Sequence, residues 1–261
     1  MLGVTLTALS GSGCASQSRP ATIESSAPNA SAPTGDTPPT PTAATTPVAT
    51  PTPTPTPDPA QDPILIAAAR AGDLAGVQQA LAAGASVTAA DADGQTALIA
   101  AAYGNHVDVA ATLIAAGADV NAKDITTQSA YLISTSEVGD DPRLLALTLA
   151  NGANVGSLDR FDGTGLIRAA DRGFRVIIAT LLTTPIDINH INNLGWTALH
   201  EAIILGDGSP AYIEVVRELV AAGADVNLVS QRDGITPLQH AEDRGYTTIA
   251  NILRDAGAFD A

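Results

Sequence analysis

The chain has 261 residues and a formal charge of −15, with 12 Lys or Arg residues against 27 Asp or Glu residues. This charge disfavours nucleic acid and anionic lipid as partners, because both carry phosphates that repel an acidic surface. The single cysteine, Cys14, excludes an intramolecular disulfide and a thiolate metal cluster. Aromatic residues make up only 3% of the sequence, so we expect a core of aliphatic and alanine side chains.

Residues 1–14 resemble a bacterial lipoprotein signal, in which an apolar stretch and small residues precede a cysteine that becomes lipid-modified. The resemblance implies lipidation at Cys14, export, and an anchor in a membrane of the cell envelope, on its periplasmic or cell-surface side. Three features depart from the pattern, since no Lys or Arg precedes the apolar stretch, that stretch is short, and Gly11 stands where leucine is usual. An ordinary secretory signal, which would give a secreted protein, and a cytoplasmic protein are the alternatives.

Residues 15–62 are rich in Pro, Thr, Ala and Ser and carry almost no aliphatic side chains. Of the 17 prolines, 12 precede residue 60, and residues 50–57 read TPTPTPTP. Alternating proline favours extended polyproline II, and a segment without aliphatic side chains cannot bury a core. The composition therefore predicts a disordered linker that, at about 3.1 Å per residue, could reach on the order of 100 Å.

From residue 63 onward the sequence repeats with a period close to that of a small helical repeat. Thr96, Ser129, Thr164, Thr197 and Thr236 occupy one frame, at spacings of 33, 35, 33 and 39 residues. The TALH at 197–200, TPL at 236–238 and GADVN at 117–121 and 223–227 closely resemble the ankyrin repeat family. The six predicted units are approximately 63–92, 93–124, 125–160, 161–192, 193–231 and 232–261.

The resemblance implies an all-α fold, an ankyrin-repeat solenoid of about six helix-turn-helix units with protruding β-turn fingers. The residues agree with it, because a Thr in the repeated frame can cap a helix and the glycine after each second helix suits a left-handed residue. The expected caps are Thr96, Thr164, Thr197 and Thr236. The leucines expected to point into the stack are Leu98, Leu166, Leu199 and Leu238.

Three repeats depart from this pattern. Repeat three has Tyr131 where the leucine belongs. In repeat four, Pro185 replaces the glycine, so its second helix must end differently. Repeat five carries about six extra residues, 207–212, between its helices, and we expect this insertion beside the first helices, on the side where such arrays usually bind.

The sequence contains no recognisable catalytic constellation. None of the four histidines lies at a metal-ligand spacing from another histidine, cysteine or carboxylate, so we expect no metal, no cofactor and no enzymatic activity. The family resemblance implies a non-enzymatic protein–protein interaction module, here a monomer tethered in the bacterial cell envelope. The alternative is an accessory or stabilising factor for an envelope enzyme, such as a periplasmic redox enzyme.

The candidate partner-binding residues are aromatic, apolar and charged side chains expected on the fingers and first helices. They are Tyr103, Phe161, Arg168, Arg172, Leu194, Trp196 and Glu201. Arg168, Glu201 and His240 stand four residues after their caps, so we expect them in a row that forms either an ion pair between repeats or the polar floor of a groove. Trp196 has an alternative place, packed under the 207–212 insertion.

Overall fold

The computed structural model describes residues 56–259, and these residues contain twelve α-helices arranged in six pairs. A short 3-10 helix, Pro59–Gln61, precedes the first pair. The helices of repeats one to three are α1 Asp62–Ala71, α2 Leu74–Ala82, α3 Ala97–Tyr103, α4 Val107–Ala115, α5 Ala130–Ser136 and α6 Pro142–Ala150. Those of repeats four to six are α7 Gly165–Arg172, α8 Arg175–Leu181, α9 Ala198–Ile204, α10 Pro210–Ala221, α11 Pro237–Asp243 and α12 Thr247–Asp255.

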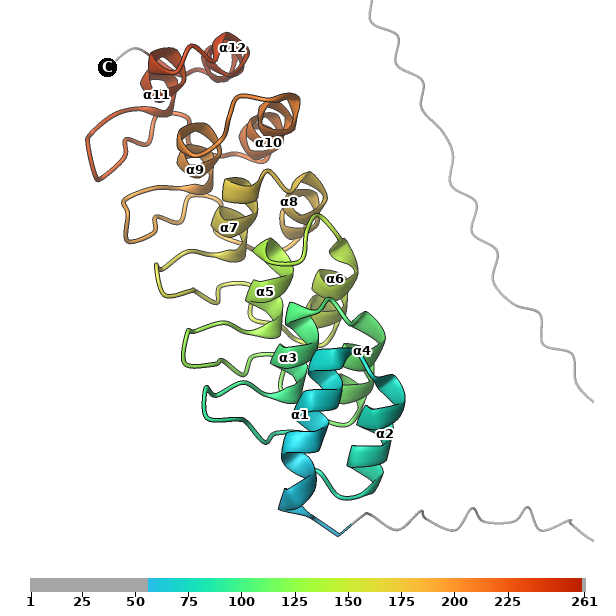
Figure 1. The fold of residues 1–261 in the computed structure, drawn as a ribbon. Helices are drawn as coiled ribbons and strands as arrows, with labels where there is room; N and C mark the ends of the chain where they lie inside the picture. Colours follow the sequence, from blue (N-terminus) through green and yellow to red (C-terminus); the bar gives the residue numbers. More distant parts are fainter. Residues whose placement is uncertain (1–55, 260–261) are drawn as a thin grey trace, which may run out of the picture. The chain divides into compact units, whose positions relative to one another are not determined.

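The helix pairs of residues 56–259 stack into two layers. The odd-numbered helices form the inner layer, next to the loops that project as fingers between repeats, and the even-numbered helices form the outer layer (Figure 1). The one bridge between extended residues within residues 56–259 joins Ala90 and Thr96 in the first finger. The predicted all-α solenoid of six helix-turn-helix units is therefore confirmed.

The helices of the inner layer begin as the sequence predicts. The hydroxyl of Thr96 accepts a hydrogen bond from the Ile99 N–H, and Thr164, Thr197 and Thr236 repeat this arrangement at the same place in α7, α9 and α11. Each hydroxyl satisfies one backbone donor that the first turn leaves unpaired. Ser129 caps α5 in the same way, so the caps recur in repeats two to six and fix where those inner helices start, whereas α1 begins after Gln61 without a side-chain cap.

The core lies between the two layers and is aliphatic, as expected. Leu98, Leu166, Leu199 and Leu238 are all at most 1% exposed. Small side chains such as Ala169 and Ala170 are fully buried beside them, which lets neighbouring helices approach closely. The glycines that follow the outer helices adopt the predicted left-handed conformation, for example Gly117 and Gly223, both at φ 97°.

The predicted disordered linker extends too far towards the repeats. Residues 1–55 lie outside the described residues, but residues 56–62, which the sequence analysis placed in the linker, are part of the folded array. The Asp58 N–H donates to the Gly84 carbonyl at 2.9 Å, and the Asp58 carboxylate caps the 3-10 helix. Composition misplaced this boundary because a single capping aspartate is enough to order a proline-rich turn against the first repeat.

In repeats three and four, a nearby residue compensates for the departure from the repeat pattern. Tyr131 is fully buried and donates its hydroxyl proton to the Val155 carbonyl at 3.2 Å. A Cβ atom on Gly165 would lie 2.6 Å from that hydroxyl, so the glycine at the start of α7 makes room for the tyrosine. In repeat four, α8 ends at Leu181, and the hydroxyl of Thr184 donates to the Leu181 carbonyl in place of a glycine cap.

The insertion in repeat five is partly helical. Residues 210–212 form the first turn of α10, the only helix of twelve residues among those described. The hydroxyl of Tyr212 donates to the Asp171 carbonyl at 2.7 Å, so the extra turn packs back on the end of α7. Tyr212 therefore braces repeat five against repeat four.

Candidate functional site

The fingers beside repeats four and five are held by side-chain oxygens that accept from the backbone of their own turn. Asp159 Oδ1 accepts from the N–H groups of Phe161 at 2.8 Å and Gly163 at 2.9 Å. Asn192 Oδ1 does the same for Leu194 at 3.0 Å and for Trp196 at 3.1 Å. This geometry is an Asx turn, which fixes a loop through one short polar side chain. It sets Phe161 and Leu194 at fixed places on the finger tips.

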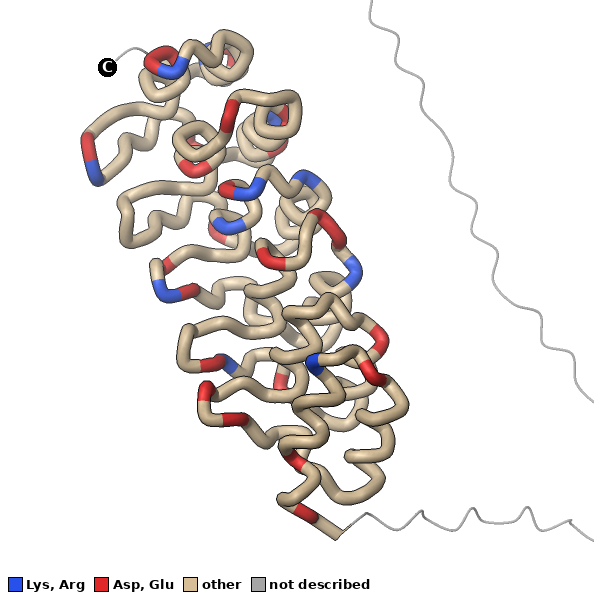
Figure 2. The backbone as a smooth tube through the Cα atoms, viewed as in Figure 1, with Lys and Arg blue, Asp and Glu red and all other residues tan. Residues whose placement is uncertain are grey.

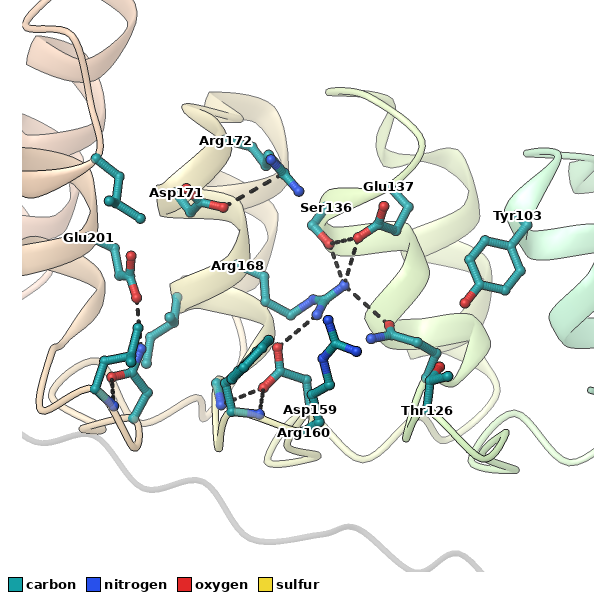
Figure 3. Close-up of a pocket in the computed structure, with 17 residues that line it drawn as sticks. Tyr103, Thr126, Ser136, Glu137, Asp159, Arg160, Arg168, Asp171, Arg172 and Glu201 are labelled. Atoms are coloured by element: carbon teal, nitrogen blue, oxygen red, sulfur yellow. Dashed lines mark hydrogen bonds and ion pairs between the residues drawn. The ribbon is translucent and has the colours of Figure 1, made fainter. Parts of the chain in front are cut away.

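A groove of about 420 Å³ lies between these fingers and the inner helices α5, α7 and α9 (Figure 3). Six of the seven predicted partner-binding residues line it: Tyr103, Phe161, Arg168, Arg172, Leu194 and Glu201. Phe161 is 46% exposed, and Tyr103 and Leu194 are also exposed. The structure thus brings together, on one face, residues that span roughly a hundred positions of sequence.

Leu205 and Asp171 are among the residues of the groove that were not predicted as partner-binding residues. Leu205 is 50% exposed. It stands eight residues after its cap Thr197, just as Arg172 stands eight residues after Thr164. Comparison of that position between repeats was therefore the signal that could have found it. Asp171 directly precedes Arg172 in the sequence.

The predicted ion pair between Arg168 and Glu201 is wrong. Arg168 instead reaches back to repeat three, donating from Nη1 to Asp159 Oδ2 at 2.8 Å and from Nη2 to Ser136 Oγ at 2.5 Å and Glu137 Oε1 at 3.1 Å. Its side chain is only 11% exposed. Several acceptors lie on that side and only one carboxylate on the other, so the guanidinium ties α7 to α5 and not to α9.

Glu201 consequently sits in the groove without a cation. Its Oε1 accepts from Asn192 Nδ2 at 2.7 Å, while its Oε2 has no hydrogen-bond partner among residues 56–259. The residue is 4% exposed. Burial, together with the negative charges of Asp171 and Asp159, raises the pKa of Glu201 to about 7, although the bond from Asn192 opposes the shift.

The third residue of the predicted row, His240, also forms no link to Glu201. Its Nε2 lies 3.7 Å from Asp233 Oδ1, and its ring meets that of His200 edge-on with centroids 6.1 Å apart. His200 is 1% exposed, and its Nδ1 lies 2.9 Å from the Thr197 hydroxyl. The histidines therefore belong to the packing between repeats five and six.

Trp196 lies outside the groove. Its indole N–H donates to Ser230 Oγ at 3.1 Å, and the guanidinium of Arg232 stands 5.6 Å from its ring centroid. Both contacts belong to the next finger and neither to the 207–212 insertion, so the alternative place of Trp196 under the insertion is wrong, while its role in partner binding stays a prediction. The indole therefore contacts the finger that leads into repeat six.

Two arginines at the rim of the groove, Arg160 and Arg172, are not held in strong ion pairs. Four of the twelve basic residues of the chain fall within residues 160–175, and Figure 2 shows basic residues near the middle of the array. Arg160 stacks on Phe161, 4.8 Å from the ring centroid. Arg172 lies 3.7 Å from Asp171 and is 49% exposed. Exposed pairs at such distances contribute little, so both guanidinium groups can bind an anion.

The described residues offer few features of a catalytic or membrane site. Within residues 56–259, no cluster of three His, Cys, Asp or Glu side chains has the geometry to hold a metal ion. None of the helices in that range is both long enough and apolar enough to cross a bilayer. What the groove can do chemically is bind, through exposed apolar side chains, two available guanidinium groups and one buried carboxyl group.

Comparison with known proteins agrees with this architecture. A family model of ankyrin repeats in three copies matches residues 54–124 and 132–230. The putative ankyrin repeat protein YahD of Escherichia coli is 37% identical over 192 residues, which covers 73% of this chain and 94% of YahD. An ankyrin repeat domain from Acinetobacter baumannii, solved by crystallography, is 44% identical with a TM-score of 0.70, and the match covers 75% of this chain and 98% of that one.

A more distant match is to part of a larger human protein. The SMC5-SMC6 complex localization factor protein 1 of Homo sapiens is 37% identical over 95 residues, which are 36% of this chain and 8% of that protein. Such repeats generally mediate protein–protein interaction and are typically non-enzymatic. With the family model spanning most of the described array, and a relative of nearly the same extent as the array, the chain belongs to the ankyrin repeat family.

Proposed function

We propose that this chain recognises another protein through the groove over repeats three to five, without catalysing a reaction. The observation that carries the proposal is the meeting of exposed Phe161 and Leu194 with the available guanidinium groups of Arg160 and Arg172 at one hollow. Aromatic and arginine side chains are the ones that most often dominate binding energy at interfaces. Since the chain is acidic as a whole, a local basic rim would favour a partner with acidic or mixed charge.

The proposal includes a place of action, the bacterial cell envelope, with the repeats tethered through a lipid on Cys14. Its support is the sequence resemblance of residues 1–14 to a lipoprotein signal, and Cys14 lies outside the described residues. Metabolic labelling with an alkyne fatty acid should label the full-length protein in a bacterial host, and Cys14→Ser should abolish the label. Equal labelling of both proteins would remove the tether from the proposal.

Photo-crosslinking tests the binding face directly. Phe161 on the groove and Val176 on the outer helix α8 are both apolar and both 46% exposed, so they form a matched pair of positions. A benzoylphenylalanine residue introduced at position 161 should capture a protein partner in envelope fractions, whereas the same residue at 176 should not. Capture of one dedicated enzyme would favour the accessory role, and capture from position 176 alone would place the binding face elsewhere.

The energetic contribution of the groove is measured with the captured partner. Phe161→Ala should weaken its binding by roughly 1–3 kcal/mol, the range of interface hot spots. Val176→Ala is the control and should leave the affinity unchanged. Neither substitution should lower the melting temperature much, because both side chains are about half exposed. Unchanged binding after Phe161→Ala would contradict the assignment of this groove.

A further inference from the structure

Glu201 is the buried acidic side chain of the groove that the contacts within residues 56–259 leave partly unsatisfied. Glu201 is only 4% exposed and lines the groove. Its Oε2 accepts no hydrogen bond from residues 56–259. Buried carboxylates are normally paired with a cation or fully hydrogen-bonded, because an isolated buried charge is costly. Figure 3 shows Glu201 on the groove side of α9, with its one hydrogen bond directed to Asn192.

The groups that face Glu201 do not supply the missing cation. Arg168, from α7, directs both terminal nitrogens to Asp159, Ser136 and Glu137 on the side of repeat three, and its buried Nε–H donates to no acceptor among residues 56–259. The charges that act on Glu201 from α7 and from the third finger are those of Asp171 and Asp159, and both are negative. This part of the groove therefore has an excess of negative charge beside a rim that is otherwise basic.

Two exposed leucines line the same groove as Glu201. Leu194, from the finger, is 37% exposed, and Leu205, from the end of α9, is 50% exposed. A long side chain that carries methylene groups and ends in a cation could lie along such leucines while its charged head reaches a buried carboxylate.

We propose that the groove receives a basic side chain of the partner, a lysine or arginine, whose cation pairs with Glu201 Oε2 while its stem packs on Leu194 and Leu205. The inference rests on the proposed function and adds the chemistry of the residue that is recognised. Asp171 lies at the same end of the groove and lends its negative charge to the pair. Arg160 and Arg172 then receive acidic side chains from neighbouring positions, so the partner segment carries charges of both signs.

Selection from a displayed library of random peptides tests this chemistry and does not require the partner itself. The bait is the full chain, and parallel selections use Glu201→Gln, the partly exposed control Glu214→Gln outside the groove and the groove variant Phe161→Ala. Peptides selected by the parent and by Glu214→Gln should be enriched in lysine or arginine at one position. That enrichment should disappear with Glu201→Gln.

A synthetic copy of the most enriched peptide gives the quantitative test. Replacing its basic residue by norleucine, which keeps the lysine stem and removes the ammonium group, should weaken binding to the parent at least tenfold. The same replacement should change binding to Glu201→Gln by less than threefold, because the pairing partner is already gone. Carboxyl carbon NMR should show that the bound lysine peptide lowers the pKa of Glu201, as a cation contact requires.

The outcomes separate this inference from the function on which it rests. If selected peptides depend on Phe161 but show no basic enrichment, or keep it with Glu201→Gln, the groove binds protein and the basic-residue site is refuted. A peptide carbonyl that accepts from protonated Glu201 would show as a raised pKa on binding, and would also refute it. If no selected peptide depends on either Phe161 or Glu201, the proposed function of the groove fails as well.

Discussion

Replacement of Glu201 by glutamine should stabilise the protein, and only at neutral to alkaline pH. The substitution keeps an oxygen that can accept the hydrogen bond from Asn192 Nδ2, and it removes a negative charge that is buried without a cation. A protein normally loses stability when a buried polar residue is changed. Here the expected gain arises because the parent carboxylate is ionised above neutral pH in a site that does not satisfy it.

The size of the gain comes from the raised pKa of the buried carboxyl group. The pKa of Glu201 moves from 4.5 in an unfolded chain to about 7 in the groove. The protonated form is therefore favoured by folding, so its contribution to stability is complete below pH 4.5 and is lost as the pH rises through 7. A tenfold change in proton affinity is worth about 1.4 kcal/mol, so the loss at pH 8.5 is about 3 kcal/mol at most.

Urea denaturation followed by far-UV circular dichroism between pH 5 and 8.5 measures this effect. Glu201→Gln and the parent should have similar free energies of unfolding at pH 5, and the variant should become more stable as the pH rises. Glu214→Gln, a change at a partly exposed side chain of α10, should follow the parent at every pH. A difference between Glu201→Gln and the parent that stays constant across the range would refute the reasoning.

Three further predictions concern packing. Burial lowers the pKa of His200 from 6.5 to about 4, so the stability that depends on its neutral ring should be present above pH 6.5 and lost towards pH 4. Urea titrations on a Glu201→Gln background should show a loss of about 3 kcal/mol at most. Gly165→Ala should destabilise the parent by about 1–3 kcal/mol and should cost less on a Tyr131→Leu background, as thermal melts of both backgrounds would show; part of the cost should remain, because Thr135 Cγ2 also lies 2.9 Å from the added Cβ. Deletion of residues 232–261 should cause aggregation or partial melting, visible by light scattering, and a truncated protein as soluble and stable as the parent would contradict it.

The sequence predicted the fold well because repeat signals reinforce one another. A capping threonine, a buried leucine and a terminal glycine recur together, so one degenerate unit such as repeat three does not obscure the period. Single substitutions at junctions are harder to predict. Asp58 orders a turn in what composition assigns to a linker, and nothing in a single repeat indicates that Gly165 compensates for Tyr131.

The sequence predicted several residues that line the groove, but not the partners with which their side chains form hydrogen bonds and ion pairs. Six of the proposed residues do share one hollow, since equivalent positions of stacked repeats become neighbours in space. The pairing of Arg168 could not be deduced, because a long side chain can reach either adjacent repeat. In the structure it hydrogen-bonds to the acceptors Asp159 and Ser136 of repeat three. The contact of Trp196 with Ser230 could not be deduced either, because the sequence does not show which side chain of the following finger lies within reach of the indole.

The Asx turns of the fingers separate the shape of this surface from its specificity. Because Asp159 and Asn192 hold their turns through backbone N–H groups, the turn geometry does not depend on which side chains occupy the two tip positions that follow. Residues such as Arg160 and Phe161 can therefore be exchanged in evolution or by grafting while the scaffold remains intact. Chains with the same finger backbone and different residues at the two tip positions would therefore share one fold and recognise different partners.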